Sequence, residues 1–300
     1  MDKEYIHIPI MLSECIKALN IKPDGIYVDA TTNRGGHAIE IAQRLGESGR
    51  LICIDLDAQA LEEAKERLSQ SKCKVDFIND NYRNLEKILS DLNIDKVDGI
   101  LADLGISSEE LDISGRGFSF MRDEPLYMTF RDKADIDDDI LTAEYIVNNW
   151  SEETISSILW GYADERYRGR IARAICEARE IKEIQTTGEL VEIIRNVVPG
   201  AYKGKRGSHF ATRTFQALRM AVNDELAGIQ DLIKSAKKVL QVEGRMAIIT
   251  FHSTEDRIVK LAIKEQSFNF INKKPIVPSD SEQKENHRSR SAKLRVISNN

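Results

Sequence analysis

Short apolar runs alternate with helical stripes of apolar residues through the first hundred positions of the chain. Ile26–Val28, Leu51–Ile54, Lys74–Ile78 and Val97–Ala102 are runs of β type and predict four strands. Between them, apolar residues recur three and four positions apart, which predicts helices over residues 12–19, 39–45, 60–68 and 85–92. Strands alternating with helices indicate a parallel, doubly wound α/β sheet, whose ligands bind at the carboxyl ends of the strands.

The alternation stops near residue 110. From residue 111 to residue 202 the pattern contains no clear strand, only a loop rich in Gly, Ser and Asp and then helices over 141–148, 152–160, 166–179 and 188–197. Helices over 212–222 and 225–240 lead to a buried strand at Arg245–Phe251, a helix starting at Ser253–Glu255, and a final edge strand at Lys293–Ile297. We therefore predict an α/β domain of residues 1–110 and 211–300, with an all-helical domain of residues 111–210 inserted into it.

The stretch from Gly25 to Asp57 has the order strand, glycine loop, helix, strand, acid. Glycines such as Gly35 and Gly36 let the backbone turn sharply and approach a ligand. The G-x-G-x-x-G pattern is absent, which argues against a pyrophosphate cradle. Asp29, which precedes the glycines, fits S-adenosylmethionine better, because that molecule carries an ammonium group and a cationic sulfur. Asp55, at the end of the next strand, is placed to accept the hydroxyls of a ribose. A tight turn in an ordinary α/β protein remains the alternative.

Composition narrows the class of protein. With 41% hydrophobic and 31% charged residues, the chain has enough apolar material for a large core and suits a water-soluble protein. The sequence contains neither an apolar run of membrane-spanning length nor a signal-peptide pattern at its start. Its four cysteines are scattered without a C-x-x-C pair, so we expect reduced thiols, no zinc and a cytoplasmic location.

The net charge of −6 disfavours a nucleic-acid partner when taken alone. The distribution of charge points the other way. Residues 203–219 hold five basic residues and no acid, and residues 284–295 hold five basic residues and one Glu. Such local patches can hold phosphate groups whatever the total charge.

Eight segments, taken in order, resemble the bacterial ribosomal RNA small-subunit methyltransferase H family, the MraW-type enzymes. They cover nearly the whole chain: HIPIML at His7, DATTNRGGH at Asp29, DLGISS at Asp103, RGFSF at Arg116, ERYRGRIARAI at Glu165, TRTFQALRMAVNDEL at Thr212, TFHSTEDRIVK at Thr250 and RSRSAKLR at Arg288.

The resemblance implies a class I (Rossmann-like) methyltransferase sheet with an inserted helical domain. It also implies transfer of a methyl group from S-adenosylmethionine to the exocyclic amino group of a decoding-site cytidine in 16S ribosomal RNA. The implied partner is the small ribosomal subunit, and a homodimer is left open. The inserted domain is expected to recognise the substrate.

The resemblance also assigns cofactor contacts. It puts the methionine part of the cofactor at Gly35, Gly36 and His37, the ribose at Asp55, and the adenine against Tyr82. Asp103 matches an acidic cofactor contact, and Glu110 stands where the family usually has Gln. Two structural alternatives stay open: His37 as a helix cap, and Tyr82 as a packed core aromatic.

Methylation of a cytosine amino group needs a hydrogen-bond acceptor, because the nitrogen lone pair is delocalised into the ring. An acceptor for the N–H groups lets the nitrogen become tetrahedral as it attacks. Many amino-methyltransferases use an acid or Asn followed by Pro-Pro-aromatic, but here Asp103 is followed by Leu-Gly-Ile. Our hypothesis is that the Asp103 carboxylate, or a main-chain carbonyl beside it, accepts from the amino group.

Candidate RNA contacts are basic residues or histidines in the inserted segment and near the end of the chain. A solvated helix face is the alternative for the arginines of RYRGRIAR, and a helix-capping role is the alternative for His252. The candidates are Arg166, Arg170, Lys205, Arg206, His209, Arg213, His252, Arg288 and Arg290.

The segment Tyr127–Arg131 departs from the family, which commonly has P-L-D-M-R-M-D where this chain has Pro-Leu-Tyr-Met-Thr-Phe-Arg from Pro125. An acid and an arginine are thereby lost near the expected substrate cleft. This departure supports an alternative function, an RNA-binding ribosome-assembly protein with the same fold and weak or altered methyl transfer. A nucleotide-dependent dehydrogenase is disfavoured because the phosphate fingerprint is missing.

Overall fold

The computed structural model describes residues 9–106, 111, 114–131, 136, 140–203 and 209–300. By packing, the chain forms two compact units, residues 1–105 with 226–300 and residues 106–225. The boundaries expected from sequence lay at 110/111 and 210/211, so residues 211–225 pack in the second unit instead of with the first. In the described part of the chain, no helix has the length and apolar character needed to cross a membrane.

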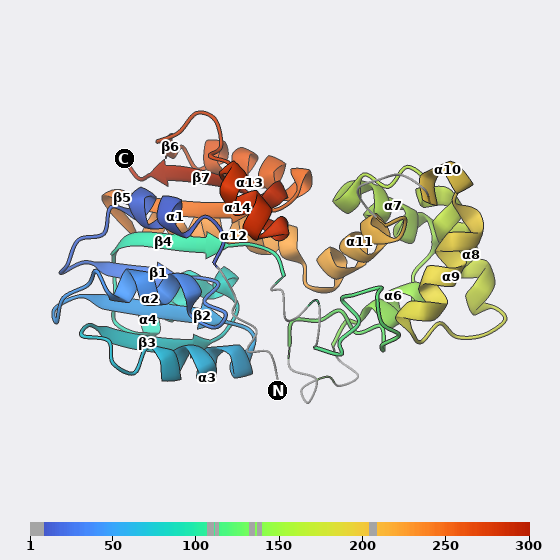
Figure 1. Cartoon of the computed structure of the whole chain (residues 1–300), viewed down its shortest axis with the longest axis horizontal. Helices are drawn as coiled ribbons and strands as arrows, with labels where there is room; N and C mark the ends of the chain where they lie inside the picture. Colours follow the sequence, from blue (N-terminus) through green and yellow to red (C-terminus); the bar gives the residue numbers. More distant parts are fainter. Residues whose placement is uncertain (1–8, 107–110, 112–113, 132–135, 137–139, 204–208) are drawn as a thin grey trace. The chain divides into compact units, whose positions relative to one another are not determined.

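The first unit is built on a seven-stranded sheet in the order β3-β2-β1-β4-β5-β7-β6 (Figure 1). The first five strands of that order run parallel, whereas β7 is antiparallel to β5 and β6 is antiparallel to β7. This is the α/β, Rossmann-like methyltransferase sheet expected from the sequence. Its strands are β1 Ile26–Asp29, β2 Arg50–Asp55, β3 Lys74–Asn79, β4 Val97–Asp103, β5 Leu240–Thr250, β6 Asn269–Phe270 and β7 Lys293–Ser298.

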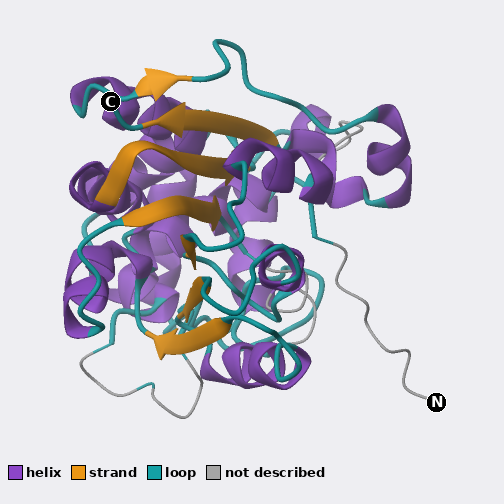
Figure 2. Ribbon diagram, turned by 90° about the vertical axis from the view of Figure 1, so that its left-hand side faces the viewer, coloured by secondary structure: helices purple, strands orange, loops and turns teal. Residues whose placement is uncertain are grey.

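Alternation of side chains along the strands gives the sheet two apolar faces, each covered by helices (Figure 2). Tyr27 and Leu101 belong to the face covered by α1 Leu12–Leu19, α2 Gly36–Ala42 and α3 Ala58–Arg67. Val28 and Ile100 belong to the opposite face, covered by α4 Leu85–Asp91, α12 Glu225–Val239 and α13 Ser253–Glu265. Neighbouring residues of one strand therefore pack into different cores. A slip of one residue would move every side chain to the wrong face, so the pairing register of the strands is fixed and their ends stay level.

Most predicted elements are confirmed within a few residues, and 12–19 and 212–222 match α1 and α11 (Thr212–Val222) in both bounds. Asp57 is the N-cap of α3, since its carboxylate accepts the Ala60 N–H at 3.0 Å. The prediction that Lys293–Ile297 is an edge strand is wrong, because the two-residue β6 pairs on its outer side. Such a short strand leaves too weak an alternation to read. The short helix α14 Asp280–Glu285 was also missed.

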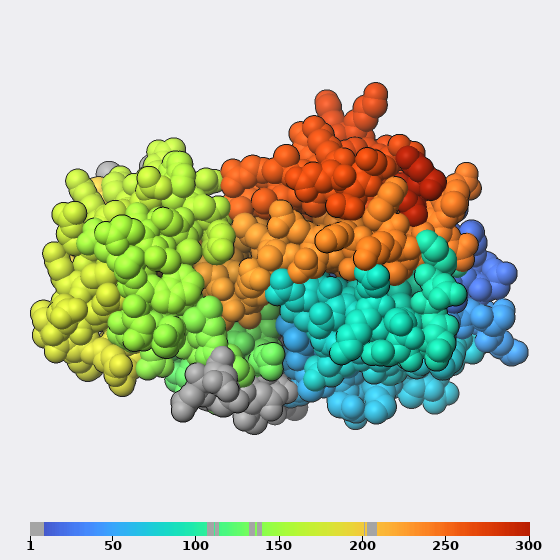
Figure 3. Space-filling view, turned by 180° about the vertical axis from the view of Figure 1, so that it is seen from behind, coloured from blue at the N-terminus to red at the C-terminus, as the bar shows by residue number. Residues whose placement is uncertain are grey.

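The second unit is helical in its described residues and has its own apolar core, to which its helices contribute buried residues. Its helices are α6 Ala143–Asn149, α7 Glu152–Ala163, α8 Arg168–Arg179, α9 Thr187–Val197, α10 Gly200–Lys203 and α11. Figure 3 shows α7 and α8 as part of its yellow-green surface. A single isolated bridge, Pro125 to Thr186, is its only β pairing among the described residues.

A fully buried carboxylate, Glu165, fixes the start of α8. One oxygen accepts the Tyr167 N–H at 2.8 Å, and the other accepts the Tyr202 O–H at 3.0 Å. Burial and the adjacent carboxylate raise the pKa of Tyr202 to about 12, so its hydroxyl remains a donor. These bonds join the chain just before α8, where Arg166 lies, to α10.

We predict that Tyr202→Phe lowers the free energy of unfolding by about 1–2 kcal/mol, because a buried carboxylate loses one of its donors. Urea denaturation measures the change. Tyr167→Phe is the matched control. The ring centroids of Tyr167 and Tyr202 are 4.9 Å apart, but the Tyr167 hydroxyl makes no hydrogen bond in the described structure. Equal stability of Y202F and Y167F would show that the Tyr202–Glu165 bond contributes nothing.

Candidate functional site at the carboxyl ends of the strands

Three acidic residues end adjacent parallel strands of the first unit. Asp29 pairs in register with Cys53 of β2 and with Leu101 of β4. Asp55 and Asp103 each lie two residues farther along those strands, so all three carboxylates lie at the same edge of the sheet. A hydrogen bond of 2.7 Å from the Asp103 N–H to Thr31 Oγ1 ties the end of β4 to the loop after β1. No sequence pattern points to this role of Thr31, because the two residues are far apart in the chain.

The loop between β1 and α2 makes its turn with left-handed residues. Gly35 has φ +80°, and a Cβ there would lie 3.3 Å from the Ala64 Cβ. Asn33 has φ 47°, a left-handed conformation that Asn tolerates better than most residues. A Cβ on Gly36 would lie 2.9 Å from Pro9 Cγ. Tight packing and backbone geometry together account for the glycines.

Asp55 holds this loop against the end of β2. Its carboxylate accepts the Asn33 N–H at 2.6 Å through one oxygen and the Asp57 N–H at 2.9 Å through the other. Burial raises the pKa of Asp55 to about 6, and these backbone donors oppose the rise. The side chain is therefore oriented by main-chain groups, and each oxygen retains a further lone pair for a ligand hydroxyl.

Asp29 and Asp103 differ from Asp55, because each has a buried oxygen without a donor. Neither Asp29 Oδ2 nor Asp103 Oδ1 has a hydrogen-bond partner in the described structure. Burial, and then the charge of Asp55, raise the pKa of Asp29 to about 7. Burial, followed by the charges of Asp29 and Glu255, raises the pKa of Asp103 to about 8. These two buried carboxyl groups therefore tend to hold protons near neutral pH, and a nearby positive charge would favour their ionised forms.

His37 and Tyr82 lie at the same edge. His37, the second residue of α2, is buried, with Nε2 3.0 Å from the Ile10 carbonyl oxygen and Nδ1 3.9 Å from Asp103 Oδ2. His37 does not cap α2. The N-cap residue of that helix is Gly35, and no side chain forms a capping hydrogen bond there. Tyr82 follows β3, begins the short 3₁₀ helix Tyr82–Asn84, and is half-buried against the apolar core.

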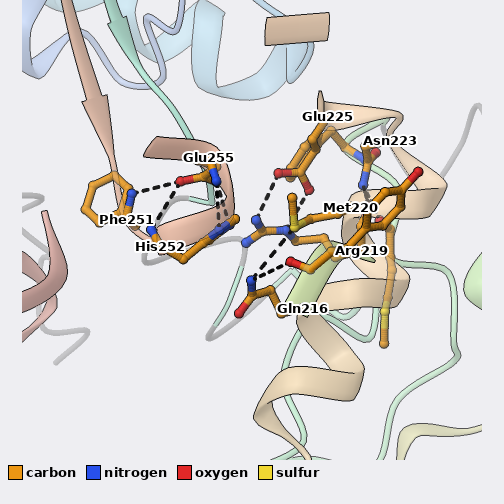
Figure 4. A network of polar contacts seen from close by, with 11 residues as sticks. Gln216, Arg219, Met220, Asn223, Glu225, Phe251, His252 and Glu255 are labelled. Atoms are coloured by element: carbon orange, nitrogen blue, oxygen red, sulfur yellow. Dashed lines mark hydrogen bonds and ion pairs between the residues drawn. The ribbon is translucent and has the colours of Figure 1, made fainter. Parts of the chain in front are cut away.

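His252 and Glu255 occupy the end of β5 and the start of α13. His252 is the N-cap of α13, which is the capping role weighed against a functional one. Glu255 is fully buried and accepts the Phe251 N–H at 2.8 Å, while its other oxygen lies 2.7 Å from His252 Nε2 (Figure 4). No pattern in the sequence links Glu255 to Asp103, whose pKa its charge helps to raise.

The C-terminal basic residues of the first unit divide into two groups. Arg295 is buried and bound to Asp256 at 2.7 Å, with Lys293 3.5 Å from the same carboxylate. Arg290 is exposed and Arg288 is half-buried in the 3₁₀ helix His287–Ser291. That helix precedes β7, and Lys293 pairs with Thr250, so the segment lies near the same carboxyl edge as the acids.

In the second unit, Arg166 and Arg170 are exposed around the start of α8. Arg213 donates to the Asp164 carbonyl oxygen at 2.5 Å and thereby joins α11 to the end of α7. His209 stacks on Phe120 with ring centroids 4.4 Å apart, and burial and then Arg195 lower its pKa, so the ring is held neutral. Three further predicted site residues, Glu110, Lys205 and Arg206, lie outside the described residues.

The segment Tyr127–Arg131 is packed against α11 of its own unit. The Asn223 side chain donates to the Met128 carbonyl oxygen at 2.8 Å and accepts the Phe130 N–H at 2.9 Å. Figure 4 shows Asn223 near the bidentate pair of Arg219 with Glu225. The residues that depart from the family pattern therefore form an ordered part of the second unit.

The donor and acceptor pattern fits S-adenosylmethionine. That molecule offers an ammonium group, a cationic sulfur and ribose hydroxyls. The undonated oxygens of Asp29 and Asp103 offer acceptors and negative charge where a cation would compensate them, and Asp55 offers oriented acceptors for hydroxyls. The loop from β1 to α2 carries Gly35 and Gly36, so no side chain projects from these two positions.

Comparison with known proteins gives full-length matches. The family model described as "MraW methylase family" matches residues 4–300. A protein named "Ribosomal RNA small subunit methyltransferase H" from Clostridium botulinum (strain 657 / Type Ba4) is 45% identical over 312 residues, covering 98% of each chain. Proteins of the same name from Brevibacillus brevis and Clostridioides difficile (strain 630) are 44% and 42% identical, covering 97% and 98% of this chain and 96% and 98% of theirs.

We predict that the ligand-free protein becomes less stable as the pH rises from about 4 to about 8. The folded pKa values of Asp29 and Asp103, about 7 and about 8, lie above the ordinary 3.8, so the folded state holds more protons than the unfolded state in this interval. The free energy of unfolding must then fall as pH rises. Asp103→Asn should raise it at pH 8.5 by about 1–3 kcal/mol in urea denaturation. The exposed Asp95→Asn is the control, and a stabilisation no larger than that control's would refute the assignment.

We further predict that Asp55→Asn weakens binding of S-adenosylhomocysteine at least about tenfold in calorimetry. The side-chain amide nitrogen of Asn at position 55 would face the N–H of Asn33 or Asp57. Placing two donors against each other costs about 1–3 kcal/mol of free energy. Asp57→Asn, which retains a good N-cap, should bind within about twofold of the unaltered chain. Unchanged binding by D55N would remove Asp55 from the cofactor site.

Proposed function

The chain belongs to the MraW methylase family, and from that premise we propose that it methylates the exocyclic amino group of a decoding-site cytidine in 16S ribosomal RNA, using S-adenosylmethionine. The observation that carries the proposal is the pair of buried, undonated carboxylate oxygens on adjacent central strands, Asp29 Oδ2 and Asp103 Oδ1. They supply negative charge at the strand ends, where ligands of doubly wound sheets bind.

When bound, the cofactor supplies an electrophilic methyl group on a cationic sulfur. The residues of the chain bind and orient it. Asp29 and Asp103 compensate its positive charges, Asp55 accepts from its ribose, and the Gly35–Gly36 turn brings the backbone beside its methionine end. Tyr82, after β3, is positioned to contact the adenine, and His37, 3.9 Å from Asp103, helps to set the orientation of that carboxylate.

The chain must also accept a hydrogen bond from the attacking amino group. Asp103 is the proposed acceptor, because Oδ1 has no donor within the described structure. Its raised pKa would keep it protonated near neutral pH in the ligand-free protein, and a protonated carboxyl is a poorer acceptor. A neighbouring positive charge lowers that pKa, so cofactor binding would prepare the acceptor before the base arrives.

The substrate assignment draws on the relatives, whose names specify the ribosomal RNA of the small subunit. Exposed arginines in both units supply cations for its phosphates, Arg290 in the first and Arg166 and Arg170 in the second. The target base must leave any stack to reach the methyl group. We assign substrate recognition mainly to the helical unit, and a ribosomal substrate places the reaction in the cytoplasm.

A second candidate is a ribosome-assembly protein with the same fold and weak or altered methyl transfer. The packed segment at Tyr127–Arg131, which lacks the acid and arginine common in the family, is the observation in its favour. Single-turnover assays separate the two candidates, because a scaffold binds small subunits without transferring methyl groups to them.

We predict single-turnover transfer of a labelled methyl group to small ribosomal subunits that lack the modification, with the label recovered at the amino nitrogen of cytidine. Asp103→Ala should lower the transfer rate at least about a hundredfold with RNA affinity within about threefold, since it removes a group that acts during attack. Asp95→Ala serves as the control. Binding of subunits without any transfer by the unaltered chain would favour the assembly protein, and full activity of D103A would remove Asp103 from the mechanism.

A further inference from the structure

An exposed tryptophan on the second unit carries an arginine on its ring. Trp160, in the last turn of α7, is 49% exposed, and the Arg168 Cζ lies 4.7 Å from its ring centroid. The other tryptophan of the chain, Trp150, is half-buried against the apolar core of the same unit. A large aromatic ring left at the surface costs hydrophobic stabilisation that burial would have given. The Trp160–Arg168 pair is therefore poorly explained by stability alone.

Two further exposed arginines, Arg166 and Arg170, lie within two residues of Arg168 along the chain. Arg166, Arg168 and Arg170 are exposed, and none is in an ion pair within the described part of the chain. They precede or occupy the first turn of α8, where no acid is present and where cations oppose the helix dipole. Their position costs helix stability, so it favours a role in contacting something negative.

The nearby acids form no ion pair with Arg166, Arg168 or Arg170 in the described part of the chain. On α8, Arg173 faces Glu152 at 3.5 Å, which compensates a different arginine. Glu153 lies seven residues before Trp160 on α7, roughly 10 Å away along the helix axis. The turn closest to Trp160 carries Ser156 and Ser157, which are small and uncharged. The acid nearest to Trp160 along α7 is Asp164, the C-cap residue, whose carbonyl oxygen accepts from Arg213.

We propose that the Trp160–Arg168 pair is a stacking site for an unpaired RNA nucleotide, whose flanking phosphates are held by Arg166 and Arg170. The inference rests on the proposed function and specifies how the helical unit contacts its substrate. A guanidinium plane held over an indole is a preformed surface on which a base adds as the next layer. Duplex RNA keeps its bases stacked internally and does not offer such a layer. The preferred ligand is therefore a single-stranded segment near the target base.

Binding of labelled oligoribonucleotides to the full chain tests this, with a single strand of about ten nucleotides compared with a blunt duplex. Trp160→Ala should weaken single-strand binding about 5- to 100-fold and leave the salt dependence unchanged, since stacking releases no counterions. Arg168→Gln should weaken binding and also reduce the slope of log affinity against log salt by roughly 0.7. Trp160→Phe retains a ring and should bind within about threefold of the unaltered chain.

Two control variants match these changes. Tyr145→Ala removes an aromatic side chain that is 54% exposed in the same unit, and Arg173→Gln removes the arginine that faces Glu152. Both should bind within about twofold of the unaltered chain. In a Trp150→Phe background, Trp160 is the only tryptophan, and its fluorescence should be quenched by the single strand but not by the duplex.

The proposal fails if W160A binds the single strand as the unaltered chain does, or if W160A weakens duplex binding equally. Methyl transfer to small subunits, measured in parallel, keeps this failure distinct from that of the proposed function. Full transfer by W160A at subsaturating subunits would overturn the stacking site and leave the methyltransferase intact. Absence of transfer by the unaltered chain would overturn the methyltransferase, while the oligonucleotide binding would still decide the stacking site.

Discussion

The candidate site of the first unit depends on two carboxyl groups buried at the ends of neighbouring strands. Asp29 and Asp103 lie at the centre of the sheet, each with an oxygen that receives no donor in the described structure. Burying a carboxylate without a donor is costly, and most proteins avoid it. Here the cost is tolerated at the one edge where the fold binds ligands, and two features hold the acids in place: the two-faced core, which fixes the register, and the Thr31–Asp103 bond. A cationic ligand would compensate the buried charge, and the cost thereby removed would contribute to the free energy of binding.

The second unit uses its charges in the opposite way. Its buried acid, Glu165, is satisfied by two donors, and its buried Arg116 donates to the carbonyl oxygens of Phe130 and Arg131 at 2.8 and 3.0 Å. These groups order the backbone, whereas the exposed arginines at the start of α8 have no ion-pair partner among the described residues. The unit is hydrogen-bonded inside and carries exposed positive charge on part of its surface, which suits the RNA contacts proposed above.

The sequence predicts the order of elements well because the signals are local. The stripe in residues 12–19, the apolar run ending at Asp55 and the cap at Asp57 each depend on neighbouring residues. It could also place Asp29, Asp55 and Asp103 at one edge, because parallel strands share a direction. It could not find the Thr31–Asp103 bond, the contact of His37 with Ile10, or the effect of Glu255 on Asp103, since each joins residues far apart in the chain. The exposure of Trp160 was missed because the residue directly follows the buried Ile158 and Leu159 in one apolar run.

Proton release on cofactor binding tests the central claim most directly. Calorimetric titration of the chain with S-adenosylmethionine at pH 7, in two buffers of different ionisation enthalpy, measures protons exchanged per ligand bound. If Asp29 and Asp103 are partly protonated in the ligand-free protein and compensated by the ligand's positive charge, binding releases protons, and Asp103→Asn reduces the number released. Binding enthalpies that are equal in both buffers, or unchanged proton release by D103N, would contradict the account.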